Sequence, residues 1–163
     1  MTIETGVVLD LAGQPLHWHL PPGRSMGGLP DSRKLWDVIW ENRDIISGIA
    51  HSHPGSGIPG PSQTDVTTFA AIEAALGRRL DWWIVSAGDE TVVLLRWAGS
   101  GKLDYHSAPI MVPYPEWIPK LCKASQTVET NVLSGGGVEV TQEVTHTEVG
   151  DTARLDVDTK IKM

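Results

Sequence analysis

The chain has 163 residues, of which 40% are hydrophobic and 20% are charged, a composition typical of a globular protein rather than a disordered one. Its net charge of −7, with no basic cluster denser than Arg78-Arg79, argues against a nucleic-acid partner, because phosphate binding requires a patch of lysines and arginines. No apolar run reaches the roughly 18 residues of a membrane helix, no signal peptide is evident and the single cysteine excludes an intramolecular disulfide, so we expect a cytoplasmic protein without a membrane partner.

The first half of the chain alternates between strand-like and helix-like segments. Residues 5–11 and 15–20 are predicted strands on either side of a short turn, a spacing suited to a hairpin. After a loop rich in glycine and proline, residues 31–42 predict a helix, and the nearly continuous apolar run at 45–50 predicts a buried strand. The predicted helix places four large apolar residues near helical spacing on one face: Leu35, Trp36, Ile39 and Trp40.

The following segments complete the body of the chain. A second helix is expected over 62–77, with its N-cap among the first residues. Residues 81–87 and 91–97 predict two strands joined by a turn, 102–108 predicts a further strand, and 114–124 predicts a short helix. The order of these elements indicates an α/β fold in which a mixed β-sheet is flanked by helices, and not a doubly wound repeat.

Residues 125–163 differ from residues 1–124 and are expected to form a separate unit. All ten aromatic residues lie at or before Trp117, and the net charge is −4 in the C-terminal unit against −3 in the longer N-terminal one. After three glycines, two runs alternate apolar and polar residues and predict a β-hairpin-like, acidic tail. A lone hairpin is marginally stable in water, so we expect this β-rich appendage to pack on the body, on a protein partner or on a second copy of the chain.

Two histidines lie two residues apart at the end of the predicted buried strand. Residues i and i+2 of an extended strand point to the same face, so the imidazoles of His51 and His53 can reach one ion. Asp65, at the start of the next predicted helix, can bring a carboxylate oxygen to the same point. Two nitrogens and one oxygen form a known catalytic zinc set. An HxH pair alone is common and seldom binds metal, but HxHP followed by a Gly/Pro loop and SxxD at a helix start is a much narrower pattern.

The segment HSHP followed by PSQTD resembles the signature of the JAMM or MPN-plus (JAB/Mov34) zinc metalloproteases, which is HxHP, a short loop and SxxD. The family also has an upstream glutamate in a Glu-x-Gly context before an apolar strand, which Glu4-Thr5-Gly6-Val7 matches. The resemblance covers roughly residues 3–100 and implies the cytidine-deaminase-like MPN fold for the domain 1–124. The loop between His53 and Ser62 is one residue longer than the usual spacing, and no segment resembles the long insertion with which eukaryotic deubiquitinases hold ubiquitin.

The resemblance also implies a role for each residue of the signature. His51, His53 and Asp65 would be the ligands of one zinc ion (Zn2+) per chain, Glu4 the general acid/base that activates the zinc-bound water, and Ser62 the hydrogen-bond donor to the oxyanion. The implied reaction is hydrolysis of a peptide or isopeptide bond, and the implied substrate is a peptide or a ubiquitin-like protein. The implied location is the cytoplasm, or the virion if a phage encodes the chain.

Two other functions compete with a zinc metallopeptidase or isopeptidase. The family contains metal-free members that only organise assemblies, and the strand-rich tail suits a non-catalytic MPN scaffold in a phage particle or another multi-subunit assembly. Such members usually lose ligands that this sequence retains, so the enzyme is favoured. A zinc deaminase is disfavoured because the chain lacks the HxE…PCxxC pattern.

Other histidines and tryptophans are weaker candidates for function. His17 and His19 form a second HxH pair, which is expected to face solvent, with a place in a substrate groove as the less favoured alternative and metal binding as the least favoured. His106 is expected at the surface without a partner. Of the adjacent Trp82 and Trp83, one must face each side of the sheet, and either is a candidate for the groove.

Overall fold

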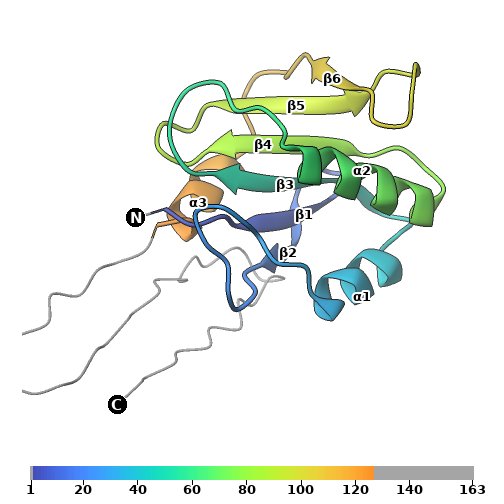
Figure 1. Ribbon diagram of the computed structural model, residues 1–163, viewed down its shortest axis with the longest axis horizontal. Helices are drawn as coiled ribbons and strands as arrows, with labels where there is room; N and C mark the ends of the chain where they lie inside the picture. Colours follow the sequence, from blue (N-terminus) through green and yellow to red (C-terminus); the bar gives the residue numbers. More distant parts are fainter. Residues whose placement is uncertain (1, 127–163) are drawn as a thin grey trace, which may run out of the picture.

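A computed structural model describes residues 2–126, and the hairpin predicted in the C-terminal tail lies outside the described residues. A six-stranded sheet has the order β2-β1-β3-β4-β5-β6, in which β3 and β4 are parallel and all other neighbours are antiparallel (Figure 1). This confirms an α/β class with a mixed sheet. Within the described residues, no helix is long and apolar enough to cross a membrane. The elements are β1 (Gly6–Asp10), β2 (Pro15–His19), α1 (Arg33–Glu41), β3 (Ile46–His53), α2 (Gln63–Leu76), β4 (Asp81–Ser86), β5 (Val92–Trp97), β6 (Tyr105–Ala108) and α3 (Trp117–Ala124).

Helices cover both faces of the sheet: α1 and α2 lie on one face and α3 lies on the other (Figure 1). The strands supply both cores through alternating side chains. In β1, Val7 and Leu9 pack with α3, whereas Val8 between them packs with α1 and α2. Burial of each such side chain contributes about 1.5–3 kcal/mol, and the two cores together fix the central strands in place.

The start and the end of α2 are fixed by specific residues. Ser62 Oγ accepts a hydrogen bond from the backbone N–H of Asp65 at 3.0 Å, and Asp65 Oδ2 accepts one from the backbone N–H of Ser62 at 2.8 Å, which is a capping box. At the other end, Gly77 has a φ of 68°, a left-handed conformation that glycine adopts without strain. The predicted helix over 62–77 is therefore confirmed to within one residue at each end.

Three details differ from the expectations. Strand β3 continues through His53, so both histidines lie within the strand rather than after it. Strand β6 starts only at Tyr105, because residues 98–104 form a turn closed by the hydrogen bond from Ala98 N to Asp104 O. The placement of Trp40 on the apolar face of α1 is wrong: its side chain is 55% exposed, because this short helix at the edge of the sheet buries only a narrow stripe around Ile39.

Candidate metal centre

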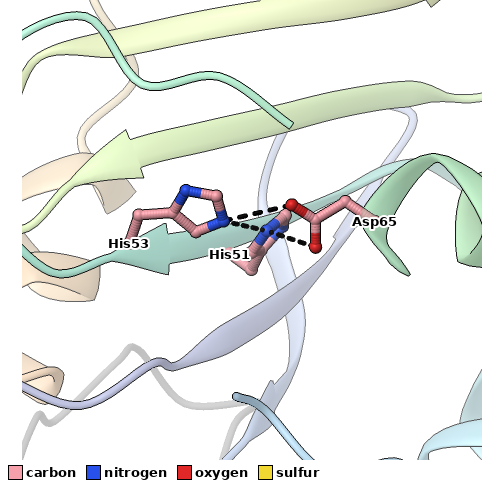
Figure 2. Close-up of side chains that lie close together, drawn as sticks. All are labelled: His51, His53 and Asp65. Atoms are coloured by element: carbon pink, nitrogen blue, oxygen red, sulfur yellow. Dashed lines mark hydrogen bonds and ion pairs between the residues drawn. The ribbon is translucent and has the colours of Figure 1, made fainter. Parts of the chain in front are cut away.

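Three potential metal ligands converge where the carboxyl end of β3 meets the amino end of α2 (Figure 2). The Nε2 atom of His51 lies 3.0 Å from Nε2 of His53 and 3.2 Å from Asp65 Oδ1. The Nε2 atom of His53 lies 3.1 Å from Asp65 Oδ2. The strand aligns the two imidazoles, the capping box aims the carboxylate, and the structure thus brings together the three residues that the sequence suggested as ligands.

These separations fit a bound metal ion. In a tetrahedral site with metal–ligand bonds of about 2.0–2.2 Å, two ligand atoms lie about 3.3–3.6 Å apart. The observed separations of 3.0–3.2 Å therefore require only a small outward movement of the side chains. His51 is buried and the other two residues are half-buried. The group could hold a metal ion while one side stays open to the adjoining cavity.

The three groups are electrostatically coupled. Burial acts to raise the pKa of Asp65, but hydrogen bonds from His51 and His53 outweigh it and hold that pKa well below its usual range. The hydrogen bond with Asp65 raises the pKa of His53 above its usual value of 6.5, against the effect of burial. Asp65 is therefore ionised near neutral pH, as a metal ligand must be.

Glu4 lines the same cavity as the three side chains. Burial raises the pKa of its carboxyl group, the charges of His51 and His53 act in the opposite direction, and Asp65 adds to the rise. Burial thus makes this carboxyl group easier to protonate than an ordinary glutamate, which suits a general acid/base.

The backbone that carries Glu4 is fixed on both sides. The N–H of Glu4 donates to Ser25 O at 2.9 Å, and the N–H of Ile3 donates to Ser125 O at 2.8 Å. The N–H of Ser52 donates to Thr5 O at 2.9 Å, which joins the residue after Glu4 to the residue between the two histidines. Glu4 precedes β1, yet its backbone is held as that of a strand residue is.

A chain of buried hydroxyl groups lies on the opposite face of the sheet, directly behind the centre. The N–H of Thr5 donates to Ser52 Oγ at 2.9 Å, the hydroxyls of Ser52 and Ser125 lie 2.7 Å apart, and Ser125 Oγ donates to Leu121 O at 2.8 Å. Because Ser125 uses its only hydroxyl hydrogen for Leu121, Ser52 must donate to Ser125, and the direction of each hydrogen bond is fixed. This chain fixes the spacing between the Glu4 segment and the strand that carries the histidines.

Ser62, the candidate oxyanion donor, lies at the N-cap of α2 and also lines the cavity. In its capping bond the Ser62 oxygen accepts from the N–H of Asp65. That bond does not use the hydroxyl hydrogen, which remains able to donate toward a group in the cavity.

The loop between His53 and Ser62 is held by the turn between β4 and β5. The N–H of Gly57 donates to Asp89 Oδ2 at 2.8 Å, and Ser86 Oγ donates to Gly57 O at 2.6 Å. The N–H of Gly88 donates to Gly55 O at 2.7 Å, and a Cβ at position 88 would lie 2.6 Å from that same oxygen, so the close approach requires glycine. The longer loop is thus accommodated without separating Asp65 from the histidines.

The prediction that His17 and His19 face solvent is wrong for His19, whereas His17 is half-buried. His19 is buried, its Nε2 donates to Pro30 O at 2.7 Å, and its ring lines the same cavity as the metal centre. Burial lowers the pKa of both histidines, that of His17 to about 4. The segment that follows β2 packs over this face of the strand, a long-range contact that strand alternation cannot reveal.

The remaining candidates are placed as follows. His106 is exposed as predicted, but it has a partner, because its Nε2 lies 2.5 Å from Asp104 Oδ1. Trp82 and Trp83 face opposite sides of the sheet as expected: Trp82 lines the cavity, and Trp83 packs against Trp117 with ring centroids 5.4 Å apart. For His19 the less favoured alternative, a place in a groove, agrees with its position in the cavity, whereas sequence reasoning missed the buried hydroxyl chain altogether.

Two comparisons of the sequence with known proteins found no relative. No protein-family model matches the chain, and no curated protein matches its sequence. The identification of a candidate metal centre therefore rests on the motif and the geometry described above.

Proposed function

We propose that the chain is a zinc-dependent metallopeptidase of the JAMM type, which hydrolyses a peptide or isopeptide bond in a domain with the MPN fold. One observation carries the proposal: two imidazole nitrogens and a carboxylate lie within 3.2 Å of one another in a cavity that Glu4 also lines. Two histidines and one carboxylate favour zinc among the common metals. The mixed sheet with helices on both faces supports the MPN part of the proposal.

The side chains of the cavity have distinct parts in the proposed reaction. Zinc, when bound, would polarise the substrate carbonyl group and lower the pKa of a water molecule toward neutrality. Glu4 accepts a proton from the attacking water as the water oxygen bonds to the carbonyl carbon. The Ser62 hydroxyl donates a hydrogen bond to the carbonyl oxygen as negative charge develops on it. Glu4 returns the proton to the leaving nitrogen as the C–N bond breaks, and the products are a carboxylic acid and an amine.

The Glu4→Gln variant tests this assignment. It keeps the size of the side chain but removes proton transfer, so we expect full zinc content and a loss of turnover of about 10²–10⁴-fold on a mixed peptide library followed by mass spectrometry. The matched control is Glu116→Gln, at an exposed glutamate that does not line the cavity. Unchanged turnover in Glu4→Gln would remove Glu4 from the mechanism, and a zinc-loaded wild-type chain that cleaves no peptide would favour the non-catalytic scaffold.

A further inference from the structure

The candidate metal centre lies at one end of a cavity of about 600 Å³. Residues of β1 and β3 form the floor, α2 forms one wall, and residues 27–31 with the start of α1 form the other. This volume is within the range of about 300–1,000 Å³ that is typical of small-molecule sites. Since only three of the lining residues are candidate ligands, the other walls can contact a part of the substrate that does not react.

The cavity beyond the metal centre has mainly apolar walls. Two polar atoms of its aromatic residues are already satisfied within the protein: Trp36 Nε1 donates to Asp31 Oδ2 at 2.5 Å, and Trp82 Nε1 donates to Glu73 Oε2 at 3.2 Å. The Trp36 ring therefore offers apolar surface rather than a hydrogen bond to a bound group, and Trp82, which is 2% exposed, supports the wall from behind. Six large apolar side chains line the cavity: Leu29, Leu35, Trp36, Phe69, Ile72 and Trp82.

Gly6 leaves one position in the floor of the cavity without a side chain. In the sheet register it lies opposite His19 on one side and His51 on the other, so no side chain stands between the metal centre and His19. Leu29 packs onto this position, because a Cβ at residue 6 would lie 3.1 Å from Leu29 Cδ2 and 3.3 Å from His19 Cβ. The glycine therefore allows an apolar side chain to close over the sheet beside the metal centre.

His19 adds no charge to this cavity near neutral pH. Its Nε2 donates to Pro30 O, so the neutral tautomer carries its hydrogen on that nitrogen. Burial lowers the pKa of His19, which keeps the ring neutral near pH 7. Glu4 and Asp65 lie at the metal end of the cavity, and the third acidic residue of the lining, Asp31, accepts from Trp36 Nε1.

We infer that this cavity is a specificity pocket that binds a large apolar side chain, such as leucine, methionine or phenylalanine, next to the scissile bond. The inference rests on the proposed function, since it places the reacting carbonyl group at the metal centre. Because the candidate ligands line the same cavity, a side chain next to the reacting carbonyl group would enter it. The apolar walls favour an apolar side chain there. A charged side chain would lose its hydration against the apolar surface of Leu29, Leu35 and Trp36.

Two small zinc-binding probes test this inference without a known substrate. Acetohydroxamic acid and hexanohydroxamic acid carry the same metal-binding group and differ by four methylenes. Each buried methylene multiplies affinity by about four, so we expect the zinc-loaded full chain to bind hexanohydroxamic acid at least tenfold more tightly in calorimetry. Equal affinities for the two hydroxamic acids would refute the apolar specificity pocket.

Two alanine positions on α2 provide a matched pair of variants. Ala71 and Ala74 are both exposed, but only Ala71 lines the cavity. Ala71→Phe should fill the pocket and remove the tenfold preference for the longer probe while acetohydroxamic acid still binds, whereas Ala74→Phe should keep the preference. Retention of the preference in Ala71→Phe would refute the location of the pocket. If neither probe binds, or the chain takes up no zinc, the proposed metal centre itself fails, and the inference fails with it.

Discussion

The two HxH pairs of this chain, His17 with His19 in β2 and His51 with His53 in β3, lie on the same face of one sheet and are separated only by β1. His51 and His53 meet a carboxylate, whereas His19 meets the backbone carbonyl of Pro30. Strand alternation aligns the imidazoles in both pairs. The segment that follows each strand decides what they contact: the capping box of α2 aims a carboxylate at His51 and His53, and the loop after β2 brings the Pro30 carbonyl to His19.

The residue between the two histidines also differs between the two pairs. Trp18 in β2 is a core side chain on the α3 face. Ser52 in β3 accepts from Thr5 N–H and contacts Ser125, which joins the strand of His51 and His53 to the Glu4 segment and to α3. One pair therefore has a positioning network behind it and the other has apolar packing.

The largest expected effect is on zinc affinity, when one imidazole is removed from each pair. The two removals should also differ most from each other. We expect His53→Ala to lower zinc affinity by at least about 100-fold, because one of three protein ligands is lost, and His17→Ala to change it by less than about threefold. Competition with a chromophoric zinc chelator measures both. Similar losses in the two variants would show that the pairs are not functionally distinct.

Truncation of Ser52, which lies behind the candidate metal centre, should have a smaller effect, and it should change stability. Ser52→Ala leaves the buried N–H of Thr5 without its acceptor, which we expect to cost about 1–3 kcal/mol in the free energy of unfolding measured with urea. Ser56→Ala, at an exposed serine in the adjacent loop, is the matched control and should change stability by less than about 0.5 kcal/mol. An equal cost at both positions would argue against a stabilising hydroxyl chain.

The two pairs should also titrate differently in the metal-free protein, as NMR of the ring signals can show. Asp65 raises the pKa of His53, so His53 should titrate above 6.5 and His17 at about 4. The contribution of His53 to stability is then present below pH 6.5 and lost as pH rises through its raised pKa, whereas burial of His17 destabilises the fold as pH falls from 6.5 toward 4. Zinc must displace the His53 proton, so zinc affinity should fall with pH below that raised pKa. Titration of both rings near 6.5 would contradict the described environments.

Most elements of the fold follow from local sequence signals. The helix over 62–77 was predictable because Ser62 and Gly77 mark its start and end. The convergence of the candidate ligands was predictable because alternation in a strand fixes the direction of His51 and His53. These features depend on residues that are close in sequence.

The features that could not be predicted depend on contacts between distant segments. Ser52 and Ser125 are 73 residues apart, and no local pattern indicates that their hydroxyls meet. The burial of His19 depends on how the loop after β2 folds, and the exposure of Trp40 depends on how little of α1 the sheet covers. Tertiary packing decides such positions, and helical or strand periodicity does not record it.

Zinc stoichiometry of the full chain tests the central claim most directly, with Asp65→Asn as the comparison. Asparagine keeps an acceptor oxygen for the N–H of Ser62 but removes the negative charge at the centre. After equilibration with excess zinc and desalting, elemental analysis should find about one zinc ion per wild-type chain and far less in the variant. A wild-type chain without zinc, or a variant with the full amount, would contradict a metal centre formed by His51, His53 and Asp65.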